Sequence, residues 1–369
     1  SVSPYSTLAN LNSGFNYIGG QQVVTFSPAG SADPSLKWEV TDQYDIGLEA
    51  GFLNNRLNFE FDYYYKKTSD LLLARELPFQ TGYKTRLENV GSLQNQGVDI
   101  TIRGIIIDSN DLSWTADLTV SSNNNELLEL TGGKEFIENG RGARLIVGKS
   151  VSTFFGAKFL GLWQEGDPGL TDTYVPGSMK FEDLDGDGFI TAFDGQIIGK
   201  GTPDFYGGLN NVVSYKNFTL SAFLDFSYGN DIYDLDGRIF NTGHATNVYG
   251  KFRDRWTPTN TDTNVPRAGA QVHTYFNNYA AQEGNDYDIH DGSYLRLKTV
   301  NLQYQIPVEV EIFQSLAVYG TATNLFTLTK YVGFSPDVNA TGTHSTRRGF
   351  DSNGYPPAKM FLIGIKADF

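Results

Sequence analysis

Apolar and polar residues alternate over long segments of this chain, and the apolar positions carry no charge. Residues 43–52 and 57–65 each switch between an apolar or aromatic side chain and a polar, acidic or small one, and Asn54-Asn55 lies between them. The uncharged phase consists of Tyr44, Ile46, Leu48, Ala50, Phe52, Leu57, Phe59, Phe61, Tyr63 and Tyr65. Successive side chains of a β-strand point to opposite faces, so one face of the expected hairpin is apolar and the other carries the acids. This division is typical of a transmembrane β-barrel, whose outer face meets lipid.

The same pattern recurs along the chain and predicts about nine antiparallel strands. We expect them at 36–52, 56–73, 85–104, 111–122, 204–215, 217–229, 289–306, 315–329 and 358–369. A Lys or Arg at mid-bilayer on the lipid face costs roughly 2–4 kcal/mol, and the apolar phase of the clear strands has none across its centre. Soluble sandwiches also alternate, but their strands are shorter and their inner face is an aliphatic core. The abundance of Phe and Tyr on the apolar phase favours the membrane barrel.

The composition argues against several other classes of protein. The 369 residues include 26 Phe, 21 Tyr and no Cys, and their formal net charge is −14. No basic cluster is present that could bind phosphates, which argues against a nucleic-acid partner. No apolar run reaches the ~18 residues of a membrane helix. The first residues lack the features of a signal peptide, so we expect either that a signal has been removed or that the chain starts inside a longer protein.

The connections between the expected strands differ greatly in length. Four are short, at 54–55, 108–111, 216–217 and 307–314, and four are long, at 74–84, 123–203, 230–288 and 330–357. Outer-membrane barrels have short periplasmic turns and long extracellular loops. We therefore expect large extracellular regions at 123–203 and 230–288, and a last strand that ends at the periplasmic side. An odd number of strands cannot close a typical bacterial barrel, so another segment must complete the wall.

An acidic loop at 183–194 is the sharpest chemical motif. It matches the calcium-loop template, with carboxylates from Asp183, Asp185 and Asp187, a carbonyl from Phe189 and a closing carboxylate from Asp194. These acids repel one another unless a cation neutralises them. The alternative is an acidic Asp/Gly turn without metal. No pair of helices is expected beside the loop, so we interpret it as a structural Ca²⁺ site rather than a sensor.

The sequence offers little support for catalysis. The four histidines, His244, His273, His290 and His344, fall in expected loops without the spacing of metal ligands. Common nucleophile, zinc-protease and phosphate-loop motifs do not occur. We therefore expect no enzyme. Aromatic residues in the loops suit sugar or peptide binding, or small loop cores.

Several sequence blocks resemble one family. The blocks are Leu36-Lys37-Trp38-Glu39, Asn89-Val90-Gly91, Asn95-Gln96-Gly97-Val98-Asp99, Arg255-Trp256-Thr257, Ser293-Tyr294-Leu295-Arg296-Leu297-Lys298 and Asn324-Leu325-Phe326-Thr327-Leu328-Thr329-Lys330-Tyr331. In this order they are similar to the C-terminal part of SusC/RagA-type TonB-linked outer-membrane transporters of Bacteroidetes. The resemblance covers nearly the whole chain.

The resemblance implies a multi-pass outer-membrane barrel of roughly 22 strands, of which this chain supplies the last part. It implies a plug and TonB box that this chain lacks, a SusD-like surface lipoprotein, and TonB-driven uptake of a glycan or peptide nutrient. The final strand, with Phe361, Ile363, Ile365 and Phe369, resembles the signal read by the barrel-assembly machinery. A non-transporting surface barrel, such as an adhesin or assembly client, and a soluble calcium-dependent sugar-binding module remain alternatives.

Overall fold

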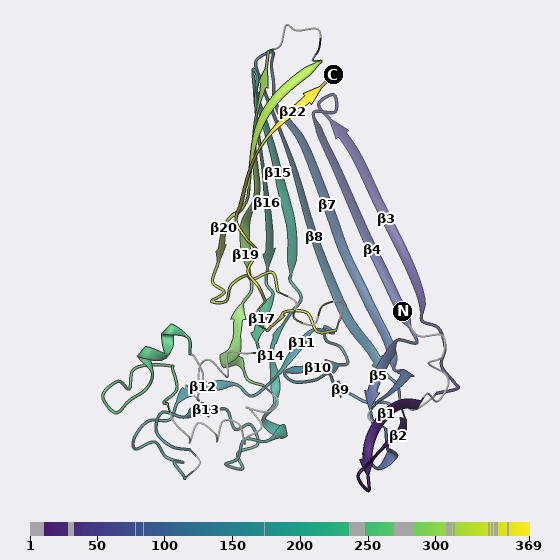
Figure 1. Cartoon of the computed structure of the whole chain (residues 1–369), viewed down its shortest axis with the longest axis vertical. Coiled ribbons are helices and arrows are strands. Elements are labelled where there is room, and N and C mark those ends of the chain that lie inside the picture. Colours follow the sequence, from purple (N-terminus) through teal and green to yellow (C-terminus); the bar gives the residue numbers. More distant parts are fainter. Residues whose placement is uncertain are drawn as a thin grey trace.

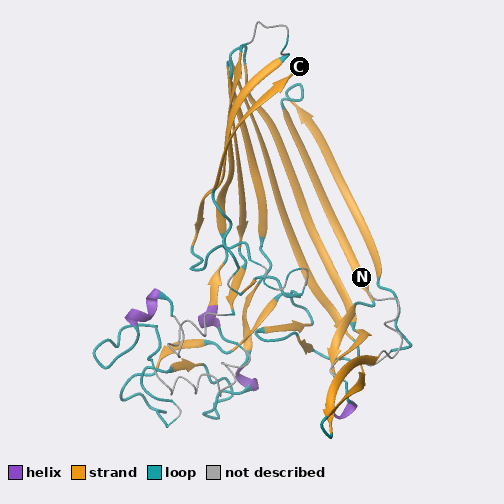
Figure 2. Ribbon diagram, viewed as in Figure 1, coloured by secondary structure: helices purple, strands orange, loops and turns teal. Residues whose placement is uncertain are grey.

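The structure is a computed structural model of the whole chain. It describes residues 11–28, 33–77, 79–83, 85–172, 174–235, 248–268, 284–307, 312, 314–338, 340, 342, 346–352 and 354–369. Its dominant element is one tall antiparallel sheet, with a layer of smaller sheets and loops at one end (Figures 1 and 2). No described helix is long and apolar enough to cross a membrane.

The tall sheet contains nine strands, and each strand pairs with the wall strands that precede and follow it in the chain. The strands are β3 (Val40–Phe52), β4 (Leu57–Ser69), β7 (Gly91–Asp108), β8 (Leu112–Leu130), β15 (Phe205–Tyr215), β16 (Phe218–Tyr228), β19 (Tyr294–Ile306), β20 (Ser315–Thr329) and β22 (Met360–Asp368). Each corresponds to one expected strand, so the predicted all-β antiparallel wall is confirmed. We call this sheet the wall.

The wall is open among the described residues. Its two outer strands, β3 and β22, do not pair with each other. This arrangement agrees with the expectation that these strands are part of a larger barrel and do not close on themselves. Figure 1 shows the wall as a curved sheet with β3 at one margin, and the order of pairing places β22 at the other.

The strand register separates the two faces of the wall. One row runs across eight strands through directly opposed apolar residues: Ala50, Phe59, Ile102, Leu118, Leu209, Leu224, Leu297 and Phe326. The adjacent row, one residue away on each strand, faces the other side: Glu49, Glu60, Thr101, Thr119, Gly208, Asp225, Arg296 and Thr327. The first row belongs to the apolar face expected to meet lipid, and the second row belongs to the lumenal face.

Asn211 is a polar exception on the apolar face. It lies on β15 directly opposite Ala116. Its side-chain oxygen accepts a hydrogen bond from Trp114 Nε1, at 3.3 Å. The amide oxygen is therefore satisfied locally, which lowers the cost of placing it beside lipid.

Short turns join the wall strands at the end away from the small sheets (Figure 1). In the β3–β4 turn, Leu53, Asn54 and Asn55 all have positive φ, at 55°, 58° and 61°. Asparagine tolerates this left-handed backbone better than most residues. The expected turn at Asn54-Asn55 is therefore confirmed.

Three expected wall strands differ clearly from the observed limits. The segment 289–306 is two strands, because β18 (Ile289–Asp291) pairs with β17 (Asp231–Asp234) and the wall strand β19 starts only at Tyr294. The segment 85–104 is two strands, because β6 (Thr85–Asn89) pairs with β5 (Leu72–Glu76) and the wall strand β7 starts only at Gly91. Gly91 has φ 150°, and a Cβ there would lie 1.9 Å from the Glu129 carbonyl oxygen. β8 continues to Leu130 rather than ending at 122. Its polar end, from Asn123 on, keeps pairing with β7 after the lipid-type alternation has stopped.

The layer beyond the wall consists of short pieces. The strands are β1 (Leu11–Ile18), β2 (Gln21–Pro28), β9 (Phe136–Glu138), β10 (Ala143–Ile146), β11 (Thr153–Gly156), β12 (Phe159–Leu162), β13 (Met179–Phe181), β14 (Gln196–Lys200), β17 (Asp231–Asp234), β18 (Ile289–Asp291) and β21 (Phe350–Asp351). Short 3₁₀ turns are η1 (Phe79–Thr81), η2 (Ala192–Asp194), η3 (Gly250–Asp254) and η5 (Asp286–Asp288).

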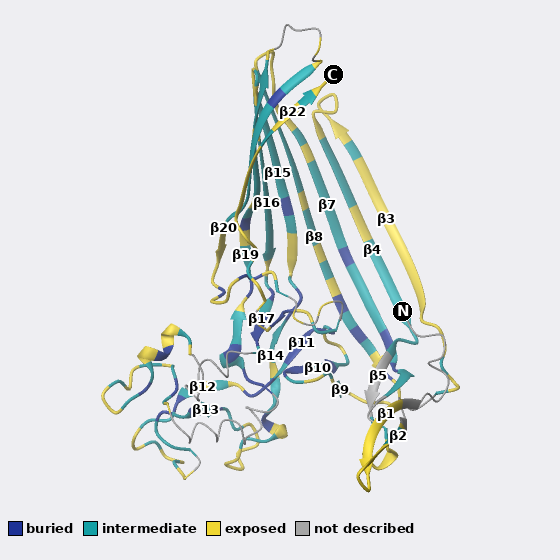
Figure 3. Cartoon of the chain, in the orientation of Figure 1, coloured by how far each residue is buried: buried dark blue, intermediate teal, exposed yellow. Residues whose placement is uncertain are grey.

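This layer holds most of the largest fully buried side chains of the described residues, and Leu127, on the polar end of β8, is an exception on a wall strand. Phe154, Tyr233 and Phe350 are at most 1% exposed and pack together, with ring centroids 5.1–5.9 Å apart. Ile46 and Ile363 on the wall are 71% and 84% exposed. Figure 3 shows the same contrast, with most dark buried segments at the loop end of the molecule. A soluble sandwich would bury the apolar face of its sheet, so the wall is not one.

Candidate functional site

The acidic loop lies between β13 and η2 and gathers the first three predicted ligands. Each of Asp183, Asp185 and Asp187 contributes a carboxylate oxygen to a group whose members lie within 4.8 Å of one another. Gly186 and Gly188 have positive φ, at 75° and 85°, which lets the backbone turn sharply between these acids. Three carboxylates this close suit a hard cation such as Ca²⁺.

Backbone N–H groups hold these carboxylates in place. Asp183 Oδ1 accepts from Gly186 N at 2.7 Å, and its Oδ2 accepts from Gly188 N at 2.8 Å. Asp187 Oδ1 accepts from Phe189 N at 2.7 Å. The side chain of Phe189 is exposed, whereas Ile190 packs against the apolar cluster around Trp256. Ile190 therefore anchors the loop.

Asp194 has a different environment from the other three acids. It is fully buried, and its oxygens accept from Leu184 N and Thr191 N, both at 2.7 Å. Thr191 and Asp194 form a capping box on η2. Burial alone would raise the pKa of Asp194, but the hydrogen bonds from Thr191 and Leu184 outweigh it and lower the pKa. Asp194 thus ties the end of the loop to its beginning, and its role as a ligand stays a prediction.

The pKa of Asp185 moves in the opposite direction. The hydrogen bond from Asp187 N is the largest single influence and lowers the pKa of Asp185, at an N–O distance of 3.1 Å. Loss of hydration and the charges of Asp187, Asp194 and Asp183 act in the opposite direction. Together they outweigh the hydrogen bond, so the pKa of Asp185 is raised. The repulsion among the acids therefore raises the pKa of Asp185, and a bound cation would relieve this repulsion.

The lumenal face of the wall carries opposed acids. Glu49 lies opposite Glu60, and Asp62 lies opposite Asp99. Arg103 Nη1 is 3.0 Å from Glu60 Oε1 and offsets part of this charge. Like charges directly opposite on a sheet are destabilising. The lumenal face is therefore built for contact with water or with a charged occupant, not for packing.

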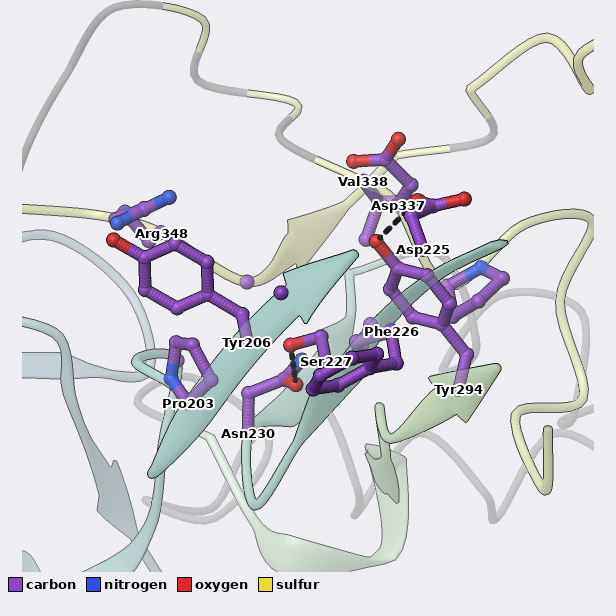
Figure 4. A pocket seen from close by; sticks show the side chains of 15 residues that line it. Pro203, Tyr206, Asp225, Phe226, Ser227, Asn230, Tyr294, Asp337, Val338 and Arg348 are labelled. Atoms are coloured by element: carbon purple, nitrogen blue, oxygen red, sulfur yellow. Dashed lines mark hydrogen bonds between the residues drawn. The ribbon is translucent and has the colours of Figure 1, made fainter. Parts of the chain in front are cut away.

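A cavity of about 450 Å³ opens on the lumenal side where β15, β16 and β19 approach the loop layer. Figure 4 shows Tyr206, Asp225 and Tyr294 from these strands facing Asp337 and Arg348 from the loops. Tyr294 donates a hydrogen bond to Asp225 Oδ2 at 3.2 Å. The volume lies within the range of about 300–1,000 Å³ typical of small-molecule sites.

Arg296 lies beside this cavity and is 4% exposed. Its Nε is 4.0 Å from Asp225 Oδ1, and its Nη1 is 3.5 Å from Asp337 Oδ2. The alternation within 217–229 predicts that Asp225 lies on the lumenal face, but it does not reveal the partners of Asp225. Arg296 could have been found from its phase on β19. The sequence gives no signal that Asp337, on a loop, would reach it.

The residues of the expected assembly signal lie on the last wall strand. Phe361, Ile363 and Ile365 lie opposite Ala322, Gly320 and Val318 on the apolar face. Phe369 follows β22 and is 76% exposed. Their recognition by assembly machinery stays a prediction.

The structure places one of the four histidines. His290 is half-buried on the short strand β18, within the expected strand 289–306 and not in a loop, and its ring centroid is 5.9 Å from that of Tyr331. His244, His273 and His344 lie outside the described residues. Burial, and to a smaller extent the charge of Lys251, lowers the pKa of His290 to about 4.

Comparison with known proteins gives consistent results. Residues 3–185 match the family model described as TonB dependent receptor-like, beta-barrel. The chain is 35% identical over 387 residues to TonB-dependent receptor P26 of Formosa agariphila, covering 100% of this chain and 38% of the relative. It is 28% identical to TonB-dependent receptor SusC of Bacteroides thetaiotaomicron, covering 96% of this chain and 34% of that protein.

A solved structure has the same fold over the full chain. The structure of the RagAB peptide transporter superposes with a TM-score of 0.82 at 25% identity, covering 100% of this chain and 39% of that one. The chain therefore spans well under half the length of the relatives it matches. These relatives are receptors and transporters by name, not enzymes.

Proposed function

We propose that this chain, which belongs to the TonB-dependent receptor β-barrel family and is similar to SusC and RagA, forms part of the wall of a nutrient importer. Proteins of this family lie in the outer membrane. The observation that carries the proposal is the two-faced wall, with an uncharged row on one side and a polar row on the other. The first face suits lipid, and the second suits an aqueous path for cargo.

The cargo class in this proposal is an oligosaccharide or a peptide. The lumenal cavity near Asp225 combines carboxylates, a guanidinium and tyrosine rings, and so offers hydrogen-bond donors, acceptors and flat apolar surfaces to either class. The similarity to the RagAB peptide transporter supports transport in general terms. It does not choose between the two cargo classes for this chain.

The proposed partners follow from the family. TonB would act through a plug formed by the rest of the protein, and a SusD-like lipoprotein would bind at the extracellular end, where the long loops gather. The barrel-assembly machinery would insert the wall. The paired name of the RagAB complex supports a two-protein importer.

We also propose that the acidic loop binds Ca²⁺ and stiffens the extracellular layer. Asp183, Asp185 and Asp187 supply converging oxygens, and the Phe189 carbonyl and Asp194 would complete the set. The support is the proximity of the three carboxylates and the tight backbone turn around them. In this role the ion would be structural, since the loop joins a strand to a short 3₁₀ turn and not two long helices.

Uptake by cells tests the main proposal. The full-length gene is deleted, and import of labelled oligosaccharides and peptides is measured with and without a functional TonB. We expect import of one cargo class to be lost in the deletion strain and in the strain without TonB. Surface binding should persist without TonB, because binding precedes the energised step. Import that continues unchanged in either strain would contradict the proposal.

A further inference from the structure

The buried guanidinium of Arg296 is incompletely satisfied. Among the described residues, its Nε and Nη2 have no hydrogen-bond partner, although Arg296 is 4% exposed. A buried charge without a full set of partners is costly. The side chain lies against the ring of Tyr294, 4.8 Å from its centroid. Its position is therefore fixed by the wall, while its hydrogen-bonding capacity is mostly unused.

The two carboxylates near Arg296 differ in how firmly they are held. Asp225 is on the wall, has a side chain that is 14% exposed, and accepts a hydrogen bond from Tyr294. Asp337 is on the loop that follows β20 and has a side chain that is 66% exposed. Its oxygen is 3.5 Å from Arg296 Nη1, beyond normal hydrogen-bond length. An ion pair with one partner this exposed contributes little stability, so Asp337 can be replaced.

Space for a replacement lies on both sides of Asp337. The cavity of about 450 Å³ is lined by Asp225, Tyr294 and Asp337, and by Arg348 on its far side. A second cavity of about 290 Å³ is lined by Arg296 and shares Asp337 with the first. Asp337 and Val338 line both cavities, so the two cavities adjoin beside Arg296.

We propose that a carboxylate on the cargo exchanges with Asp337 and binds Arg296. The cargo group would be a uronic acid of an oligosaccharide or the C-terminus of a peptide. This inference rests on the proposed transport function and adds to it a charge requirement. A carboxylate matches the planar fork of a guanidinium and can use the Nη2 group that Asp337 leaves unpaired. The exchange replaces one negative charge with another, so the net charge around Asp225 and Arg296 is unchanged. Arg348, on the far side of the larger cavity, adds a second positive charge.

The test uses the full-length transporter purified in detergent. Calorimetry compares two matched pairs of probes: trigalacturonate with its methyl ester, and a tripeptide with its C-terminal amide. The variants are Arg296→Gln and Asp337→Asn. We expect one acid to bind better than its neutral counterpart. In Asp337→Asn that acid should bind about two- to fivefold more tightly, because a competing but weak ion pair is removed. In Arg296→Gln the preference should disappear, while the neutral probe binds as before.

The opposite signs of the two variants separate a binding role from a structural one. If the Arg296–Asp337 pair only holds the loop, both variants should weaken binding of acid and neutral probes alike. That result, or no acid preference in either pair, overturns the inference. Cellular import that depends on TonB but not on cargo charge would overturn only the inference and leave the proposed function in place. The pair that shows the preference identifies the source of the carboxylate.

Discussion

Glu49 of β3 lies directly opposite Glu60 of β4 on the lumenal face. Glu60 also forms an ion pair with Arg103, in which Arg103 Nη1 is 3.0 Å from Glu60 Oε1. Glu49 has no such partner among the ion pairs of the described residues. The repulsion between the two acids is tolerated because both side chains reach toward the lumen rather than into a dry core. This pair is a sensitive probe of what fills the lumen.

Neutralising Glu49, which has no ion-pair partner among the described residues, should stabilise the wall. Glu49→Gln removes a like-charge contact, worth about 0.2–1 kcal/mol between opposed residues on a sheet. Glu60→Gln should give no gain, because it also removes the contact with Arg103. The temperature at which the full-length barrel loses its compact electrophoretic form measures both. A Glu49→Gln protein that unfolds earlier than wild type would show that Glu49 contacts a cationic group of another segment.

A charge on the apolar row should prevent assembly, and the same charge one residue away should not. Leu118→Arg places a guanidinium in lipid at a cost of roughly 2–4 kcal/mol. Thr119→Arg, on the next residue of β8, points the same group into the lumen. Surface labelling of intact cells should show reduced levels of the first variant and near-normal levels of the second. Equal loss for both variants would contradict the assignment of faces.

Calcium binding should depend on the clustered acids and on pH. Asp185→Asn should weaken binding measured by calorimetry on the full-length protein, whereas Asp172→Asn, in the same segment 123–203 but outside the cluster, should not. The pKa of Asp185 is raised, and the ion needs the deprotonated form. Affinity should therefore fall as the pH falls toward that raised pKa. Unchanged binding by Asp185→Asn, or no binding by wild type at millimolar calcium, would remove the proposed site.

Acid should loosen the loop layer around His290. Its pKa is about 4 in the folded protein and 6.5 when unperturbed, so the unfolded state binds more protons between these values. The stabilisation is fully present above about pH 6.5 and declines as the pH falls toward 4. Hydrogen exchange of β17 and β18 should accelerate over that interval. His290→Gln should reduce the pH dependence, and an unchanged dependence in this variant would assign it to other groups.

The wall could be predicted from the sequence because lipid imposes a rule on every second residue. The row through Leu118 and Leu224 is readable without coordinates, since no charge interrupts its phase. The rule stops applying where strands leave the membrane. The pattern therefore does not predict the split at Gly91, the split between β18 and β19 or the polar end of β8, because backbone pairing continues there without the lipid alternation.

The two candidate sites also differ in how far the sequence predicts them. The acidic loop is local, so its spacing places Asp183 and Asp187 close together whatever surrounds them. The contact between Arg296 and Asp337 joins a wall strand to a distant part of a loop. Such a contact depends on how the loop folds back, and neither residue type nor spacing reveals it.

The central claim is that the apolar face of the wall meets lipid and the polar face meets water. The 369 residues contain no cysteine. After any cysteine elsewhere in the full-length protein is replaced by serine, single cysteines carrying nitroxide labels are placed along β16 in the reconstituted protein. We predict that labels at Leu220 and Leu224 collide mainly with oxygen dissolved in the bilayer, and that labels at Thr219 and Ser221 collide mainly with a water-soluble nickel chelate. Loss of this alternation, with both sets equally accessible to the chelate, would contradict the account.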